Sequence, residues 1–216
     1  MRALRAGTEG PLVARDRASR SEAKPLRLFI AADVPEDVKT TLAGTLAPFR
    51  DRIPGGRWTR SDGWHVTLKF LGATWPRLMD DVRGAVRSVA QTSRAFETSL
   101  TQVGVFPSAR RARVLWAGLA DPEARFGAMV KRLDDLLEDH FVPENRPFTP
   151  HLTLVRLTPS RDVGEFAPDL VGAAVPSRPF VVDRLVLYRS HLSPQGARYE
   201  PLASEAFGGV SSLPTS

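Results

Sequence analysis

The chain has 216 residues and a mass of 23.7 kDa, with 42% hydrophobic and 25% charged side chains, a composition typical of a globular protein. No apolar run approaches the roughly 20 residues of a membrane helix, and the lack of cysteine excludes disulfides, thiolate metal sites and a cysteine nucleophile. The net charge of +6 favours anionic partners such as RNA or nucleotides, although residues 1–24 supply half of this excess. We therefore expect a cytoplasmic protein that does not associate with a membrane, and we expect it to be a monomer.

Both ends of the chain lack the periodicity of folded elements. Residues 1–24 are rich in Arg, Ala, Gly and Ser, and no apolar segment of a secretory signal follows the basic start. This composition predicts a disordered basic extension. Residues 204–216, which contain Gly208-Gly209, are predicted to form a second disordered tail. The folded domain is then expected to span residues 25–203.

Strands and helices alternate between these ends. The sequence predicts strands at 26–32, 65–71, 96–105, 113–119, from 151, at 180–188 and at 198–202. Helices are expected after Asp33, Pro76 and Asp121, where proline or an N-capping side chain precedes apolar residues at helical spacing. This order predicts an α+β fold that is bilobal and pseudo-twofold, with two antiparallel sheets facing a central cleft and helices packed outside.

The pattern His-x-Thr-Leu occurs twice, at residues 65–68 and 151–154, although the chain has only 4 histidines. Side chains in a strand alternate between its two faces, so we expect His65, Thr67 and Lys69 on one face of the first strand. The same alternation puts His151 and Thr153 together. Each strand would thus present an imidazole and a hydroxyl to a cleft while its other face packs in the core.

Two imidazoles at one site suit the cleavage of a phosphoester. The ordinary pKa of histidine is near 6.5, so one ring can be neutral and the other protonated near neutrality. A neutral ring deprotonates the attacking water, and a protonated ring protonates the leaving oxygen. Threonine hydroxyls can bind the phosphoryl oxygens. The repeated motif therefore predicts His65 and His151 as catalytic residues and Thr67 and Thr153 as phosphate-binding residues.

Three further side chains are substrate-binding candidates. Lys69 and Arg156 are cations close to the motifs, and Phe70 offers an aromatic face for a base. By strict alternation Arg156 faces away from His151, so it reaches the cleft only if the strand ends or contains a bulge.

Five segments resemble the two-histidine phosphoesterases, and among them the bacterial and archaeal RNA 2′,3′-cyclic phosphodiesterases, once called 2′-5′ RNA ligases. They are LRLFIAA at 26–32, HVTLKFLG at 65–72, VGVFP at 103–107, RVLW at 113–116 and RPFTPHLTLVR at 146–156. The resemblance covers residues 26–203 in the same order.

This resemblance implies a bilobal fold, no metal and no cofactor, and hydrolysis of a terminal 2′,3′-cyclic phosphate to a 2′-phosphate. His65 would protonate the leaving 3′ oxygen and His151 would activate water. Thr67 and Thr153 would hold the phosphate, and Arg156 would help to bind the nucleotide. The implied partner is an RNA with a 2′,3′-cyclic phosphate end or a small cyclic nucleotide.

Three alternatives stay open. The same residues could join or cleave 2′-5′ linkages or open other cyclic phosphates, because an acid–base pair serves both directions of a reaction. The chain could also bind RNA without turnover, although binding alone does not need two imidazoles. A metallohydrolase is disfavoured, since there is no His-Glu-x-x-His motif and no cysteine.

Overall fold

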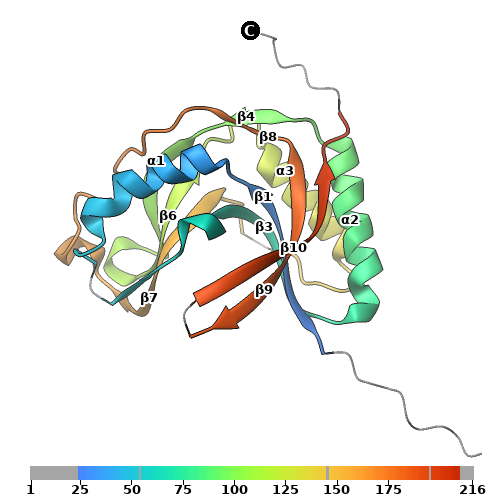
Figure 1. Cartoon of the computed structure of the whole chain (residues 1–216), viewed down its shortest axis with the longest axis horizontal. Coiled ribbons are helices and arrows are strands. Elements are labelled where there is room, and N and C mark those ends of the chain that lie inside the picture. The colour runs from blue at the N-terminus through green and yellow to red at the C-terminus, as the bar shows by residue number, and fades with distance from the viewer. Residues whose placement is uncertain (1–23, 54, 145, 195, 210–216) are drawn as a thin grey trace, which may run out of the picture.

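A computed structural model describes residues 24–53, 55–144, 146–194 and 196–209 (Figure 1). The predicted N-terminal extension lies outside the described residues except for Lys24, and so do residues 210–216 of the predicted tail. In the described part of the chain, no helix is long and apolar enough to cross a membrane.

Two four-stranded antiparallel sheets form the centre of the molecule. The first has the order β10 (Gly196–Ala206), β9 (Arg184–Ser193), β1 (Leu26–Asp33) and β3 (His65–Thr74). The second has the order β2 (Gly56–Trp58), β7 (His151–Arg161), β6 (Ala112–Leu119) and β5 (Leu100–Phe106). Strands β4 (Phe96–Thr98) and β8 (Phe180–Val182) pair separately. The α+β class and the presence of one motif strand in each sheet are confirmed.

The described residues form three α-helices, namely α1 (Glu36–Leu46), α2 (Met79–Thr92) and α3 (Arg125–Leu137). Their apolar residues are buried at the predicted helical spacing, because each helix turns one stripe toward the core. These buried residues include Val38, Leu42, Leu46, Val82, Val86, Val89, Phe126, Val130, Leu133 and Leu137. They belong to one continuous core that includes side chains from both large sheets.

The two sheets do not correspond to the two halves of the sequence. Strand β2 comes from the first half but pairs with β7, whereas β9 and β10 from the last quarter join β1. Helix α3 packs against α2 and β3, so both helices cover the first sheet. Each sheet therefore combines strands from both halves of the sequence. Strand β2 was not predicted, because it is too short to show a strand periodicity.

The folded chain continues beyond the predicted boundary at residue 203. Strand β10 extends to Ala206, and the amides of Gly208 and Gly209 donate to the carbonyls of Ala90 and Ser93 at 3.1 and 3.0 Å. Residues 204–209 thus run along the end of α2 (Figure 1).

Candidate active site

The first motif strand contains a β-bulge directly after its threonine. In the β1–β3 ladder, Ala31 lies opposite Thr67 and Ile30 lies opposite Lys69, so Leu68 is an extra residue on the β3 side. An extra residue in one strand of a pair reverses the face on which the following side chains lie.

The second motif strand has the same irregularity at the same place. In the β6–β7 ladder, Trp116 lies opposite Thr153 and Leu115 lies opposite Val155, which leaves Leu154 unpaired. The burial sequence from the histidine onward is identical in the two strands over seven residues. The two motifs are therefore equivalent in backbone geometry as well as in sequence.

The bulges overturn the predicted alternation beyond each threonine. Phe70 and Arg156 are exposed on the same side of their strands as the threonines. The bulge at Leu154 turns Arg156 toward the cleft, which its predicted role requires. Lys69 instead points into the core and forms an ion pair with Asp134 of α3. The prediction that Lys69 binds substrate is wrong, because the bulge at Leu68 turns it away from the cleft.

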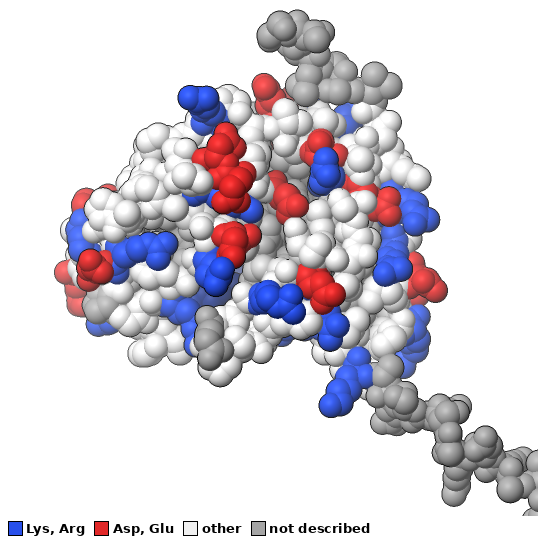
Figure 2. All heavy atoms as spheres, in the orientation of Figure 1, with Lys and Arg blue, Asp and Glu red and all other residues white. Residues whose placement is uncertain are grey.

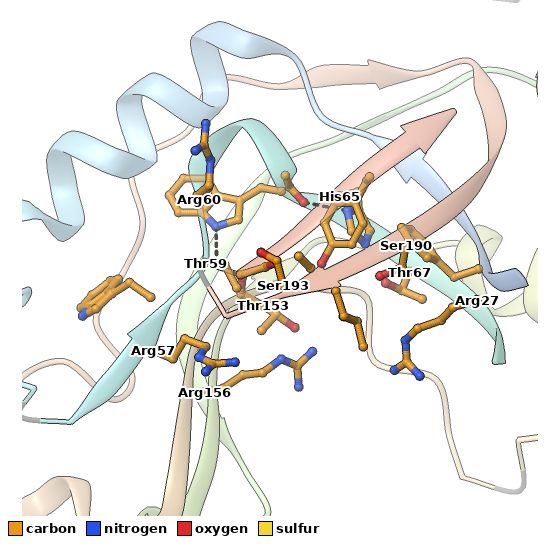
Figure 3. Close-up of a pocket in the computed structure, with 18 of the residues that line it drawn as sticks. Arg27, Arg57, Thr59, Arg60, His65, Thr67, Thr153, Arg156, Ser190 and Ser193 are labelled. Atoms are coloured by element: carbon orange, nitrogen blue, oxygen red, sulfur yellow. Dashed lines mark hydrogen bonds between the residues drawn. The ribbon is translucent and has the colours of Figure 1, made fainter. Parts of the chain in front are cut away.

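A cavity of about 630 Å³ opens between the two sheets (Figure 3). Strands β1, β3, β9 and β10 line it from the first sheet, and β2 and β7 from the second. The predicted site residues that line it are His65, Thr67, Phe70, Thr153 and Arg156. His151 is not among the lining residues, although its charge acts on His65 and Thr153 of the same strand lies in the cavity.

Both histidines are held by the same hydrogen bond. Nδ1 of His65 lies 2.7 Å from the carbonyl oxygen of Gly63, and Nδ1 of His151 lies 2.7 Å from that of Thr149. A carbonyl oxygen only accepts, so Nδ1 must carry the hydrogen in both rings. In each neutral ring Nε2 is then the basic nitrogen. Each motif therefore fixes the tautomer in which Nε2 takes up a proton.

Aromatic side chains surround both imidazoles. The ring of His65 stacks on Phe29 with centroids 4.6 Å apart and meets the edge of Tyr199 at 5.0 Å. The ring of His151 meets Phe106 in a T-shaped contact at 5.2 Å. These contacts remove water from the rings and fix their orientation.

Burial is the main influence on the pKa values of both histidines in the substrate-free protein. It lowers the pKa of His65 to about 4, while Asp33 acts in the raising direction and His151 in the lowering direction. Burial also lowers the pKa of His151, and the charge of Arg156 adds to this. Both lowered pKa values favour neutral rings in the free protein, so the acid needs a further source of its proton.

A threonine outside the motifs joins the two motif strands. The indole Nε1 of Trp64, which precedes His65, donates to the hydroxyl of Thr59 at 2.7 Å (Figure 3). That hydroxyl lies 2.7 Å from the carbonyl oxygen of Thr153 and donates to it. Thr59 thus connects the start of β3 to the threonine of the second motif.

The sequence did not predict several residues of the cavity, and three of these residues are arginines. Arg27, Arg57 and Arg60 line the cavity together with Arg156, and none of the described acidic side chains does. An exposed Arg27 within the apolar strand 26–32 was a usable signal, because it marks the face opposite the core. Arg57 had no such signal, since β2 has only three residues.

Two antiparallel sheets that each bring a His-x-Thr strand to one cavity define the two-histidine phosphoesterase class. The family model of the 2′-5′ RNA ligase superfamily matches residues 29–194. The chain belongs to this superfamily, and it is accordingly an enzyme that acts on phosphodiester bonds.

Known relatives match over most of their length. The chain is 29% identical to an RNA 2′,3′-cyclic phosphodiesterase of Methanothermobacter thermautotrophicus over 177 residues, which cover 81% of this chain and 95% of the relative. A crystal structure of a Thermus thermophilus protein has a TM-score of 0.73 and 26% identity, and covers 86% of this chain and 100% of that one. Escherichia coli LigT complexed with NADP+ has a TM-score of 0.66 and 26% identity, covering 87% and 100%.

Proposed function

We propose that this enzyme hydrolyses 2′,3′-cyclic phosphate ends of RNA to 2′-phosphates by acid–base catalysis with His65 and His151, without a metal ion. The observation that carries the proposal is the pair of Nδ1–carbonyl hydrogen bonds, which leaves Nε2 of both rings to exchange protons. The relative from M. thermautotrophicus, an RNA 2′,3′-cyclic phosphodiesterase, supports the choice of substrate.

The reaction needs a base that removes a proton from water and an acid that donates a proton to the leaving oxygen. Nε2 of His151 removes a proton from water as the water oxygen attacks phosphorus. The bond between phosphorus and the 3′ oxygen breaks, and Nε2–H of His65 donates its proton to that oxygen. Thr67 and Thr153 hold the phosphoryl oxygens, where negative charge accumulates in the transition state. The product is a 2′-phosphate with a free 3′ hydroxyl, and solvent exchange then resets both rings.

The charged neighbours support this division of roles. Asp33 raises the pKa of His65, whereas Arg156 lowers that of His151. In the free protein burial outweighs both influences. A bound phosphate anion counteracts the burial effect by favouring the charged form of a nearby imidazole. The proton of the acid is therefore acquired as the substrate binds, and the assignment of this role to His65 follows the family resemblance, with Asp33 as the charged neighbour that favours it.

The first test is turnover of a short RNA ending in a 2′,3′-cyclic phosphate, in the presence of EDTA, with the product identified by phosphorus NMR. We expect a 2′-phosphate product and a loss of turnover of at least a hundredfold in His65→Ala and in His151→Ala. His140→Ala is the matched control, because this imidazole lies at the surface next to Asp81. Activity that EDTA abolishes and zinc restores would overturn the metal-free mechanism.

A substrate with sulfur in place of the 3′ oxygen separates the roles of the two histidines. A thiol has an ordinary pKa near 8.5, so the sulfur leaves without help from an acid. We expect this substrate to restore turnover in His65→Ala but not in His151→Ala. Restoration in His151→Ala alone would reverse the assignment. A 2′-5′ linked product formed from two RNA ends would instead support ligation.

A further inference from the structure

The pseudo-twofold relation between the motif strands is broken at one position of the cavity. Phe70 and Arg156 both lie five residues after their histidine and both follow a bulge. Phe29 lies opposite Phe70 in the β1–β3 ladder, and Val114 lies opposite Arg156 in the β6–β7 ladder. The position therefore holds an aromatic ring in the first sheet and a guanidinium in the second, so the two ends of the cavity present different chemical groups.

The end at the first sheet presents an aromatic surface. The ring of Phe70 is 52% exposed, which is unusual for a phenylalanine in a strand. The guanidinium of Arg27 lies 4.5 Å from its centroid and covers one side of the ring. The remaining side suits the flat face of a nucleobase.

The end at the second sheet presents two adjacent positive charges. Arg57 of β2 lies directly opposite Arg156 of β7 in the ladder, and both side chains extend into the cavity beside Thr153 (Figure 3). Like charges opposite each other in a sheet destabilise it. An anion between the guanidiniums would remove this repulsion.

Neither of these two arginines has an acidic partner among the described residues. Nearby arginines differ in this respect, since Arg52 pairs with Asp169 and Arg60 pairs with Asp62. Basic and acidic side chains are interspersed over the face seen in Figure 2, whereas the described lining of the cavity contains arginines and no carboxylate.

A single cyclic phosphate carries one negative charge and is already assigned to Thr67 and Thr153. The guanidiniums of Arg57 and Arg156 exceed what that group requires. We propose that Arg57, together with Arg156, binds a second phosphate, the one on the 5′ oxygen of the terminal ribose. The inference rests on the proposed function, and it defines the substrate class as cyclic-phosphate ends that carry a 5′ phosphate group.

Ligand binding tests this subsite independently of turnover. The probes are a nucleoside 2′-phosphate and the corresponding 2′,5′-bisphosphate, measured by calorimetry on the whole chain. One charge-assisted hydrogen-bonded pair is worth about tenfold in affinity, so we expect the second phosphate to tighten binding by at least that factor. Arg57→Ala should abolish the gain, and it should weaken binding of the bisphosphate more than binding of the 2′-phosphate. Equal affinities in the unmodified protein would overturn the subsite even if the enzyme is active.

Arg113→Ala is the matched control. Arg113 is an exposed arginine of β6 in the same sheet, but it does not line the cavity. Its removal changes the net charge equally and should leave the second-phosphate gain intact. If both variants lose the gain equally, the effect is long-range electrostatics and Arg57 is not a ligand.

Kinetics then identify the source of the second phosphate. The substrates are a 2′,3′-cyclic nucleotide with a free 5′ hydroxyl, the same nucleotide with a 5′-phosphate, and a dinucleotide with a cyclic end. A lower KM for both phosphorylated substrates, lost in Arg57→Ala, shows that Arg57 reads the phosphate itself. A lower KM for the dinucleotide alone shows recognition of the RNA chain. If Arg57→Ala raises KM by the same factor for all three substrates, the proposal is contradicted.

Discussion

Lys69 and Asp134 form a buried ion pair between strand β3, which carries His65, and helix α3. The same groups also reach the segment that leads to the second motif. Nζ of Lys69 donates to the carbonyl of Val142 at 3.5 Å, and the carboxylate of Asp134 accepts from the amide of Glu144 at 3.4 Å. This small network therefore fixes β3, α3 and the approach to β7 relative to one another.

Removing one partner of this pair is expected to destabilise the fold strongly. Lys69→Met leaves the Asp134 carboxylate buried without a counter-charge, which costs about 3–5 kcal/mol. The double variant Lys69→Met/Asp134→Leu should recover most of this loss, because an apolar pair needs no compensation. Urea unfolding measures both effects. Lys131→Ala, which breaks an exposed pair with Asp135, is the control and should unfold like the unmodified protein.

The error over Lys69 shows which part of the site the sequence predicts. The His-x-Thr repeat correctly indicated two strands at one cavity, because alternation holds from each histidine to its threonine. Beyond each threonine, the bulge determines on which face of the strand the following side chains lie. In β7 the two consecutive apolar residues Leu154 and Val155 signal it, but in β3 the charged Lys69 hides the same pattern. Only its partner Asp134, 65 residues away, explains a buried lysine there.

Arg57, which shares the cationic end of the cavity with the predicted Arg156, was beyond sequence reasoning for a different reason. Arg57 lies in a three-residue strand whose position depends on pairing with β7, about 100 residues later in the chain. Likewise Tyr199 reaches His65 because β10 pairs with β9 and β9 pairs with β1. Such contacts follow from long-range pairing, and no local pattern encodes them.

Thr59 is expected to support catalysis without touching the substrate phosphate. Thr59→Val removes the hydroxyl that accepts from Trp64 and donates to the carbonyl of Thr153. The loss leaves the buried indole N–H of Trp64 without its acceptor, which costs about 1–3 kcal/mol in unfolding free energy. We expect kcat to fall together with stability, whereas Thr59→Ser retains both. A Thr59→Val enzyme with normal kcat would show that this link does not position the motifs.

Acid is expected to destabilise the protein through His65. Its pKa is about 4 in the folded chain, against an ordinary value near 6.5 in the unfolded chain, so the unfolded state binds more protons between these values. Above about pH 6.5 the group has no effect, and as the pH falls toward 4 it removes up to roughly 1.4 kcal/mol per unit. His65→Gln should flatten the pH dependence of urea unfolding. An unchanged slope in His65→Gln would contradict the lowered pKa.

The two kinetic constants are expected to have different pH optima. The pH dependence of kcat/KM reports the free enzyme, in which the pKa values of both His65 and His151 are lowered. The pH dependence of kcat reports the complex, in which the phosphate anion raises the pKa of a nearby imidazole. The optimum of kcat/KM should therefore lie at a lower pH than that of kcat. Coincident optima would show that substrate binding does not supply the proton of the acid.

Gly104 is expected to control the position of His151 through Trp116. Gly104 lies opposite Trp116 in the β5–β6 ladder, and a Cβ at this position would overlap the indole ring. That ring lies with its centroid 6.1 Å from His151. Gly104→Ala should therefore push the indole toward the imidazole, destabilise the fold by about 1–3 kcal/mol and lower kcat by as much as a hundredfold.

A helical glycine gives the matched control for this substitution. Gly84 of α2 has nothing within 4 Å of an added Cβ, so Gly84→Ala should stabilise the protein by about 0.5–1 kcal/mol and leave kcat unchanged. Thermal unfolding and steady-state kinetics of the two variants, compared side by side, separate the loss of space at Trp116 from the general effect of an added methyl group. If Gly104→Ala is destabilised but keeps its kcat, the indole supports the sheet and does not position His151.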